Sequence, residues 1–231
     1  MRQLLLLHGA IGSKEQLSSL AGLLSGHYDV HTLNFSGHGG EAVPARFNMD
    51  VFAADVLRYM DDRQIGQADI FGYSMGGYVA LSLAYRYPSR IGKIMTLATK
   101  FDWSPATAEK ESKMLDPDKI EQKLPAFADA LRQRHAPQDW KMVLQRTAAM
   151  MREMGAQPPL TESILSQIGH KAMIGVGEKD KMVTVEETKR TSDLLKRGKF
   201  FLLENTPHPI EQIDTGKLKK ACLDFFSSSP A

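Results

Sequence analysis

Short apolar runs alternate along the chain with stretches whose apolar residues recur at helical spacing. The runs predict strands at residues 4–7, 28–33, 69–72, 91–98, 171–176 and 199–203, the last of them buried. The helical spacing predicts helices at residues 14–24, 49–63, 78–87 and 217–226. Strands that alternate with helices are typical of βαβ units, in which neighbouring strands run parallel. The pattern therefore predicts an α/β fold built on a mostly parallel sheet.

The pattern changes between residues 99 and 168, where no strand signal occurs. Helices are expected instead at residues 119–134 and 138–154. One face of the second helix is formed by Trp140, Val143, Leu144, Thr147, Met151 and Met154. This segment predicts a helical insertion, residues 101–168, in a core made of residues 1–100 and 169–231.

Composition agrees with one globular domain and narrows the classes of partner. The chain has 231 residues, of which 42% are apolar, enough for one large core. Its formal net charge is only +2, and Lys and Arg are interspersed among Asp and Glu. This balance predicts neither a nucleic-acid-binding surface nor a membrane-binding surface. The pattern indicates no particular oligomeric state.

The ends of the chain and its single cysteine bear on the compartment. The apolar run at residues 4–7 is too short for a signal peptide, and no stretch is long enough to cross a membrane, so a cytoplasmic protein is expected. Cys222 is a single cysteine, so an internal disulfide is excluded. Its place in the C-terminal helical pattern favours a packing role. The serine-rich tail at residues 227–230 is expected to fray.

An apolar run leads directly into a glycine-rich turn and then into a helix at Gly72-Tyr73-Ser74-Met75-Gly76, which has the G-x-S-x-G spacing of a nucleophile elbow. Such a turn exposes the serine hydroxyl in a strained backbone conformation, and the two glycines leave room for it. The helix that follows points its first amides at the nucleophile, so the Met75 N–H is a candidate oxyanion donor. An ordinary glycine-rich turn can give the same pentapeptide, so the motif needs partners elsewhere in the chain.

A second oxyanion donor is expected on the loop after an early strand. The run at residues 4–7 ends in His8-Gly9-Ala10, and Ser13 can cap the helix that follows. The Ala10 amide is therefore the candidate second donor. His8 is an alternative base, but its position at a strand end before the serine favours a structural role in ordering the loop.

The acid of the site should come after a later strand, because enzymes with this elbow carry Ser, then Asp or Glu, then His along the chain. The strand expected at residues 171–176 is followed by Gly177-Glu178-Lys179-Asp180. Asp180 is the favoured acid and Glu178 its nearest competitor. Either carboxylate could also be a solvated surface group.

The base should follow the last strand. There His208 lies between Pro207 and Pro209, which fix φ on both sides and hold the turn rigid. A neutral imidazole in this place can take the proton of Ser74 and return it to the leaving group. A surface histidine in a proline turn is the alternative, which the chain order of the motifs disfavours.

Together these pieces resemble the α/β-hydrolase superfamily over residues 1–100 and 169–231. The matching motifs are Leu7-His8-Gly9, Asn34-Phe35-Ser36-Gly37-His38-Gly39, Gly72-Tyr73-Ser74-Met75-Gly76-Gly77, Gly177-Glu178-Lys179-Asp180 and Pro207-His208. Several motifs in the right order are more specific than any one of them. The resemblance implies that Ser74 is the nucleophile, His208 the base and Asp180 its partner, with an oxyanion hole formed by the amides of Ala10 and Met75. It also implies that the helical insertion forms a cap over the active site.

Two features depart from the family pattern. Asn34 stands where the family often has Asp, at a position that organises the loop. The usual opening hairpin is missing because the chain starts on the strand that leads to His8, so a six-stranded, mostly parallel sheet is expected. Some relatives take the triad carboxylate from the position after an earlier strand, which makes Asp102 an alternative to Asp180.

The insertion is rich in side chains that suit an adaptable apolar pocket. The candidate substrate contacts are Trp103, Phe127, Trp140 and Met151, and packing of the cap onto the core is the alternative for each. No cluster of Arg or Lys stands out to receive a phosphate, so a small-molecule substrate with a modest apolar part is expected. No metal-ligand spacing is present, and neither a metal nor an organic cofactor is implied.

These residues predict hydrolysis of a small carboxylic ester or thioester through an acyl-enzyme on Ser74. The same residues support a lyase or a carbon–carbon bond hydrolase, in which Ser74 and His208 move protons without a lasting ester. A non-catalytic ligand-binding protein is a third possibility, because fold does not determine function.

Overall fold

A computed structural model describes residues 1–227, so the tail expected to fray lies outside the described residues from residue 228 onward. Six strands form one sheet in the order β2-β1-β3-β4-β5-β6, and every neighbouring pair is parallel. The strands are β1 Gln3–Leu7, β2 Asp29–Thr32, β3 Ala68–Tyr73, β4 Ile91–Leu97, β5 Lys171–Gly177 and β6 Arg197–Leu203. The predicted fold class is confirmed, and the sheet is wholly rather than mostly parallel.

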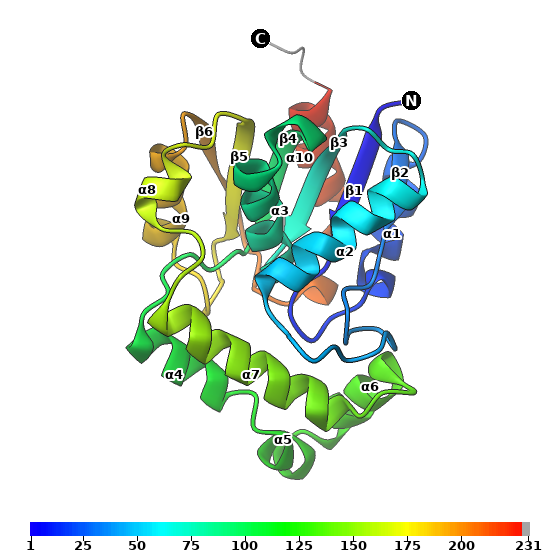
Figure 1. Cartoon of the computed structure of the whole chain (residues 1–231), viewed down its shortest axis with the longest axis vertical. Coiled ribbons are helices and arrows are strands. Elements are labelled where there is room, and N and C mark those ends of the chain that lie inside the picture. The colour runs from blue at the N-terminus through cyan, green and yellow to red at the C-terminus, as the bar shows by residue number, and fades with distance from the viewer. Residues whose placement is uncertain (228–231) are drawn as a thin grey trace.

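Helices cover both faces of the sheet (Figure 1). One face packs on α1 Ser18–Leu24 and α10 Thr215–Phe226. The other face packs on α2 Met49–Asp62, α3 Met75–Arg86, α8 Glu162–Leu165 and α9 Val185–Leu194. Short 3-10 turns occur at Lys14–Leu17, Pro88–Arg90 and Ile210–Gln212. Because strand side chains alternate, Leu5 and Leu7 of β1 enter one core and Leu4 and Leu6 enter the other.

The strand order reverses beside β1, because the chain goes from β1 outward to β2 and then returns to β3 on the opposite side. In open parallel sheets, ligands bind at such a switch point, beyond the carboxyl ends of the strands. The loops after β1 and β3 carry Ala10 and Ser74. The topology therefore brings these two residues, 64 positions apart in the chain, to one end of the sheet.

Strand β6 was expected to be buried, and this prediction is wrong. Only Leu203 is buried, and Arg197, Lys199 and Leu202 are exposed. The strand lies at the edge of the sheet with β5 as its one neighbour, so its apolar residues are only partly covered. Apolar content alone does not distinguish an edge strand from a central one.

Four helices lie across the carboxyl end of the sheet and form what we call the cap (Figure 1). They are α4 Pro105–Lys113, α5 Pro117–Lys123, α6 Pro125–His135 and α7 Trp140–Ala156. The single helix expected at residues 119–134 is two helices, because Pro125 cannot continue the first and starts the second. Helix α8, in the last part of the predicted insertion, packs against α3 and α9 of the core.

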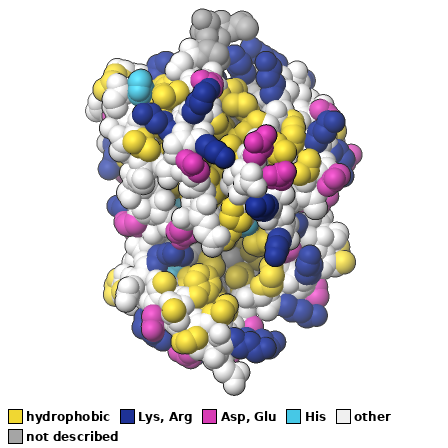
Figure 2. Space-filling model, turned by 180° about the vertical axis from the view of Figure 1, so that it is seen from behind, with side chains coloured by type: hydrophobic (Ala, Val, Ile, Leu, Met, Phe, Trp, Pro, Cys, Tyr) yellow, Lys and Arg dark blue, Asp and Glu magenta, His cyan; other side chains and the backbone are white. Residues whose placement is uncertain are grey.

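Side chains of both charge signs are mixed over the face seen in Figure 2. Within residues 1–227, no helix combines the length and the apolar character needed to cross a membrane. Cys222 is fully buried in α10, and this burial raises the pKa of its thiol to about 12. A thiol that stays protonated at neutral pH agrees with the expected packing role.

Candidate active site

Ser74 occupies a strained turn between β3 and α3, with φ 51° and ψ −118°. The turn is held by hydrogen bonds: the Ser74 amide donates to the Leu97 carbonyl (2.8 Å), and the Thr99 hydroxyl donates to the Ser74 carbonyl (2.8 Å). A Cβ added at Gly72 would lie 2.4 Å from the Gly77 nitrogen, and one at Gly76 would lie 2.4 Å from the Leu7 carbonyl oxygen. Both glycines of the motif are therefore required by close backbone contact, as the elbow geometry demands.

Asp180 and the partly buried His208 form a pair beyond the ends of β5 and β6. The distance between His208 Nδ1 and Asp180 Oδ2 is 2.7 Å, and the Asp180 side chain is fully buried. The other carboxylate oxygen, Oδ1, accepts hydrogen bonds from the amides of Met182 (2.8 Å) and Val183 (2.9 Å). The Tyr73 hydroxyl, next to the elbow serine, donates to the His208 carbonyl (2.8 Å). Asp180 thus orients the imidazole by one oxygen while the backbone orients the carboxylate by the other.

The two competing carboxylates lie elsewhere. Asp102 is half-exposed and pairs with Arg190 on the surface. Glu178 is exposed and accepts a hydrogen bond from the Asn205 amide (2.8 Å). Within residues 1–227, neither carboxylate makes a hydrogen bond or ion pair with His208, so the geometry favours Asp180 as the partner of the imidazole.

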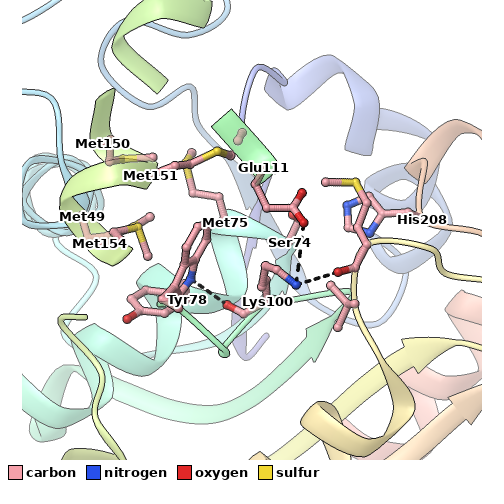
Figure 3. A pocket seen from close by; sticks show the side chains of 14 residues that line it. Met49, Ser74, Met75, Tyr78, Lys100, Glu111, Met150, Met151, Met154 and His208 are labelled. Atoms are coloured by element: carbon pink, nitrogen blue, oxygen red, sulfur yellow. Dashed lines mark hydrogen bonds and ion pairs between the residues drawn. The ribbon is translucent and has the colours of Figure 1, made fainter. Parts of the chain in front are cut away.

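Ser74 and His208 face one cavity between the core and the cap, with a volume of about 50 Å³ (Figure 3). Six methionines line it: Met49, Met75, Met150, Met151, Met154 and Met182. Among the described residues, the Ser74 hydroxyl makes no hydrogen bond to His208. Catalytic hydrogen bonds are often loose without substrate and tighten in the complex. The methionine side chains are flexible enough to widen so small a space for a ligand.

The four aromatic and methionine residues predicted for the pocket divide into two pairs. Trp103 and Met151 line the cavity. Phe127 is 38% exposed on α6, and Trp140 is buried inside the cap, where it packs with Leu131 and Leu144. Neither Trp140 nor Phe127 is among the residues that line this cavity.

Several lining residues had no sequence signal, among them Tyr78, Lys100 and Glu111. Tyr78 lies on α3, and its hydroxyl accepts a hydrogen bond from the Leu160 amide (2.9 Å), in the segment that follows α7. Lys100 and Glu111 are single charged residues in stretches that contain other charges. No periodicity distinguishes a charged side chain that enters a cavity from one that faces water.

Ala10 and Met75, whose amides are the predicted oxyanion donors, both line the same cavity. Met75 is the first residue of α3, and an amide in that position has no acceptor within its own helix. Next to Ala10, Ile11 has φ 51°, which is unusual for a β-branched residue. Its carbonyl accepts hydrogen bonds from Arg134 (3.0 Å) and from His135 Nε2 (3.1 Å), both on α6. The cap thereby fixes the conformation of the loop that carries Ala10.

Three buried histidines surround this loop. His8 Nε2 accepts a hydrogen bond from the Phe35 amide (3.2 Å), so the proton lies on Nδ1, which donates to the Gly9 carbonyl (2.7 Å). Burial lowers the pKa of His8 and of His135 to about 4, and lowers the pKa of His38 well below its ordinary value. His8 is therefore a neutral structural group, in agreement with the role expected for it. Asn34 also orders this region, because it accepts from the Lys14 amide (2.8 Å) and donates to the Gly39 carbonyl (3.1 Å).

We expect the free energy of unfolding to fall as the pH is lowered from about 6.5 towards 4. The folded state holds His8 with a pKa of about 4, while an unfolded histidine titrates near 6.5, so the unfolded state binds more protons in this range. The contribution is complete above the unfolded pKa, and at pH 5 the loss from His8 alone is about 2 kcal/mol. Urea unfolding at pH 8 and at pH 5 measures this difference.

Two variants test the origin of the pH effect. His135→Gln removes a second buried imidazole and should flatten the profile, whereas His27→Asn removes an exposed imidazole and should leave it as in the wild type. A free energy of unfolding that is equal at pH 8 and pH 5 would contradict the neutral, buried state of these histidines.

The comparisons with known proteins agree with this fold. The sequence model of the alpha/beta hydrolase fold family matches residues 3–152, which is more than half of the chain. The chain therefore belongs to the α/β-hydrolase fold family. The likeness of the whole fold extends to solved structures, such as a thermophilic esterase from Thermogutta terrifontis, with a TM-score of 0.79 and 19% identity over 98% of this chain and 90% of that one.

Curated relatives match this chain over less than half of its length. Esterase YbfF of Escherichia coli is 29% identical over 94 residues, which is 41% of this chain and 37% of the relative. A pimeloyl-[acyl-carrier protein] methyl ester esterase of Neisseria meningitidis serogroup C is 28% identical over 99 residues, which is 43% of this chain and 37% of the relative. The matched segment spans about a third of the length of such relatives.

Proposed function

We propose that this protein is a serine hydrolase that cleaves a small carboxylic ester or thioester through an acyl-Ser74 intermediate. The observation that carries the proposal is the 2.7 Å contact between His208 and the buried Asp180, with His208 on the same cavity as the elbow serine. A pair oriented in this way is the arrangement that activates a serine hydroxyl. Two relatives with partial matches are named esterases, which supports the same reaction class.

Each residue has one role in the proposed reaction. Ser74 Oγ attacks the carbonyl carbon, and His208 Nε2 takes the serine proton because Nδ1 is engaged by Asp180. Asp180 stabilises the imidazolium that forms. The amides of Ala10 and Met75 hold the oxyanion, and His208 then protonates the leaving alcohol or thiol. Water, activated by the same imidazole, hydrolyses the acyl-enzyme.

The cavity supports a substrate with a small acyl group. Its lining by six methionines and Trp103 suits a modest apolar part, and a volume of about 50 Å³ leaves room for few atoms without movement of the cap. We therefore propose short acyl chains as the preferred class.

Trapping of the intermediate tests this proposal. The protein is incubated with a fluorophosphonate probe and, separately, with p-nitrophenyl esters of increasing chain length, and the adduct is located by peptide mass spectrometry. We expect label on the peptide that contains Ser74 and the highest kcat/KM for short acyl chains. Turnover without any adduct would favour proton-transfer chemistry, as in a lyase or a carbon–carbon bond hydrolase. Absence of both turnover and label would favour a ligand-binding protein.

A further inference from the structure

The candidate cavity has a polar end formed by three charged residues. Lys100 follows β4, and its ammonium donates to the Met182 carbonyl (2.7 Å). The same Nζ lies 3.6 Å from Glu187 Oε2 and 4.0 Å from Glu111 Oε1. Figure 3 shows the Lys100 ammonium and the Glu111 carboxylate pointing towards one another, with Met150, Met151 and Met154 to one side and His208 to the other. Lys100 and Glu111 both line the cavity.

Glu187 is used fully by the fold. Its Oε1 accepts from the amides of Phe101 (2.8 Å) and Asp102 (3.1 Å), and its Oε2 accepts from the Thr184 amide (3.3 Å) at the start of α9. Glu187 therefore connects the loop that follows β4 to the first turn of α9. Its role is structural, and it is not available to a ligand.

Glu111 differs from Glu187, because one of its carboxylate oxygens accepts no hydrogen bond from the described residues. The residue is 2% exposed on α4, and within residues 1–227 its Oε2 has no hydrogen-bond partner. A buried carboxylate oxygen without a donor costs free energy, and an apolar side chain would pack the same helix face without that cost. A group that arrives with the ligand and donates a hydrogen bond would satisfy this oxygen.

The charges around Oε2 select the kind of donor. Glu111 and Glu187 bring two carboxylates against the one ammonium of Lys100, so a carboxylate on the ligand would be repelled. A ligand ammonium at Oε2 would be attracted by the carboxylates, but the Lys100 ammonium, whose Nζ is 4.0 Å from the Glu111 carboxylate, opposes it and weakens that attraction. A hydroxyl group suits both neighbours, because it donates to Glu111 Oε2 and accepts one of the Lys100 protons that Met182 leaves free.

We propose that Glu111 and Lys100 bind a hydroxyl group of the substrate, so that the enzyme prefers small hydroxylated esters. This inference rests on the proposed function, because it names the substrate class of the same site. The methionines then contact the apolar part of the substrate, and the polar pair determines which small ester is chosen.

The first test compares esters that differ in a hydroxyl group. Hydrolysis of ethyl butyrate, ethyl 3-hydroxybutyrate and 2-hydroxyethyl butyrate by the full chain is followed in a pH-stat. We expect kcat/KM of one hydroxylated ester to exceed that of ethyl butyrate by roughly 10- to 100-fold, the effect of a hydrogen bond to a charged group. Equal values for the three esters would overturn the inference, and so would a stronger preference for butyrylcholine, which carries a cation without a hydrogen-bond donor.

The second test assigns the preference to Glu111. In Glu111→Gln the side chain keeps its shape but loses its charge, so the ratio of kcat/KM for the hydroxylated and plain esters should fall at least several-fold. Glu109→Gln is the matched control, because Glu109 is exposed on the same helix and pairs with Lys113. It should keep the wild-type ratio. A ratio that is unchanged in Glu111→Gln would overturn the assignment, and a merely structural role would change stability without changing the ratio.

A binding measurement separates failure of this inference from failure of the proposed function. Ligand-observed NMR with Ser74→Ala compares the affinities for ethyl 3-hydroxybutyrate, 2-hydroxyethyl butyrate and ethyl butyrate without any need for turnover. If the wild type hydrolyses none of the esters but Ser74→Ala binds a hydroxylated ester more tightly than ethyl butyrate, the hydrolase is rejected and the hydroxyl site is supported. Hydrolysis of all the esters with equal affinities and equal rates would support the hydrolase and reject the hydroxyl site.

Discussion

Ser74→Ala is expected to lower kcat for the best ester by a factor on the order of 10⁴ to 10⁶, the usual effect of removing the nucleophile of such a triad. The substitution removes the attacking oxygen and little else, because in the described part of the chain the hydroxyl makes no hydrogen bond. The turn is held by the backbone of Ser74. We therefore expect the melting temperature to stay near that of the wild type. Steady-state kinetics and thermal unfolding measure the two quantities.

The control for this variant is Ser89→Ala, which removes an exposed hydroxyl beyond the other end of α3. It should leave kcat unchanged. The fluorophosphonate label should disappear from Ser74→Ala and persist in Ser89→Ala. Activity of Ser74→Ala within tenfold of the wild type would reject Ser74 as the nucleophile.

Asp180→Asn is expected to lower kcat by roughly 10³- to 10⁴-fold, because it favours the wrong tautomer of the base. The amides of Met182 and Val183 donate to Asp180 Oδ1, so they select the asparagine oxygen at that position. The asparagine NH₂ then takes the place of Oδ2 and donates to His208 Nδ1. The imidazole proton is forced onto Nε2, which can no longer accept the proton of Ser74.

Asp102→Asn is the matched control, since it is the other carboxylate considered for this role. It loses an ion pair with Arg190 on the surface, and exposed pairs contribute little. We expect kcat to change less than threefold. The reverse ranking of the two variants would move the acid to the loop after β4, and small losses in both would mean that neither carboxylate orients the base.

Several features of the protein follow from local patterns in the sequence. The alternation of apolar runs and helical spacing predicted the α/β fold, because period and length distinguish buried strands from helices. The Gly72 and Gly76 spacing predicted the turn at Ser74, because only glycine tolerates the close backbone contacts of that turn. Chain order suggested Asp180 and His208, which the structure brings to 2.7 Å, while their catalytic roles stay a prediction.

Other features were decided by contacts between distant parts of the chain. Strand β6 is half-exposed because of its place at the sheet edge, which its apolar sequence does not encode. The break between α5 and α6, by contrast, has a local cause, because Pro125 cannot continue a helix and starts a new one.

The candidate pocket shows most clearly which properties the sequence determines and which depend on tertiary packing. The sequence determined that the insertion is helical and rich in methionine and aromatic residues, because these properties are local. Only the tertiary structure decided that Trp103 and Met151 face the cavity, while Trp140 packs within the cap and Phe127 lies at its surface. It alone placed Lys100 beside Glu111, because the direction of a helix face depends on how the cap packs on the core. A charged residue that enters a cavity has the same sequence signal as one that faces water.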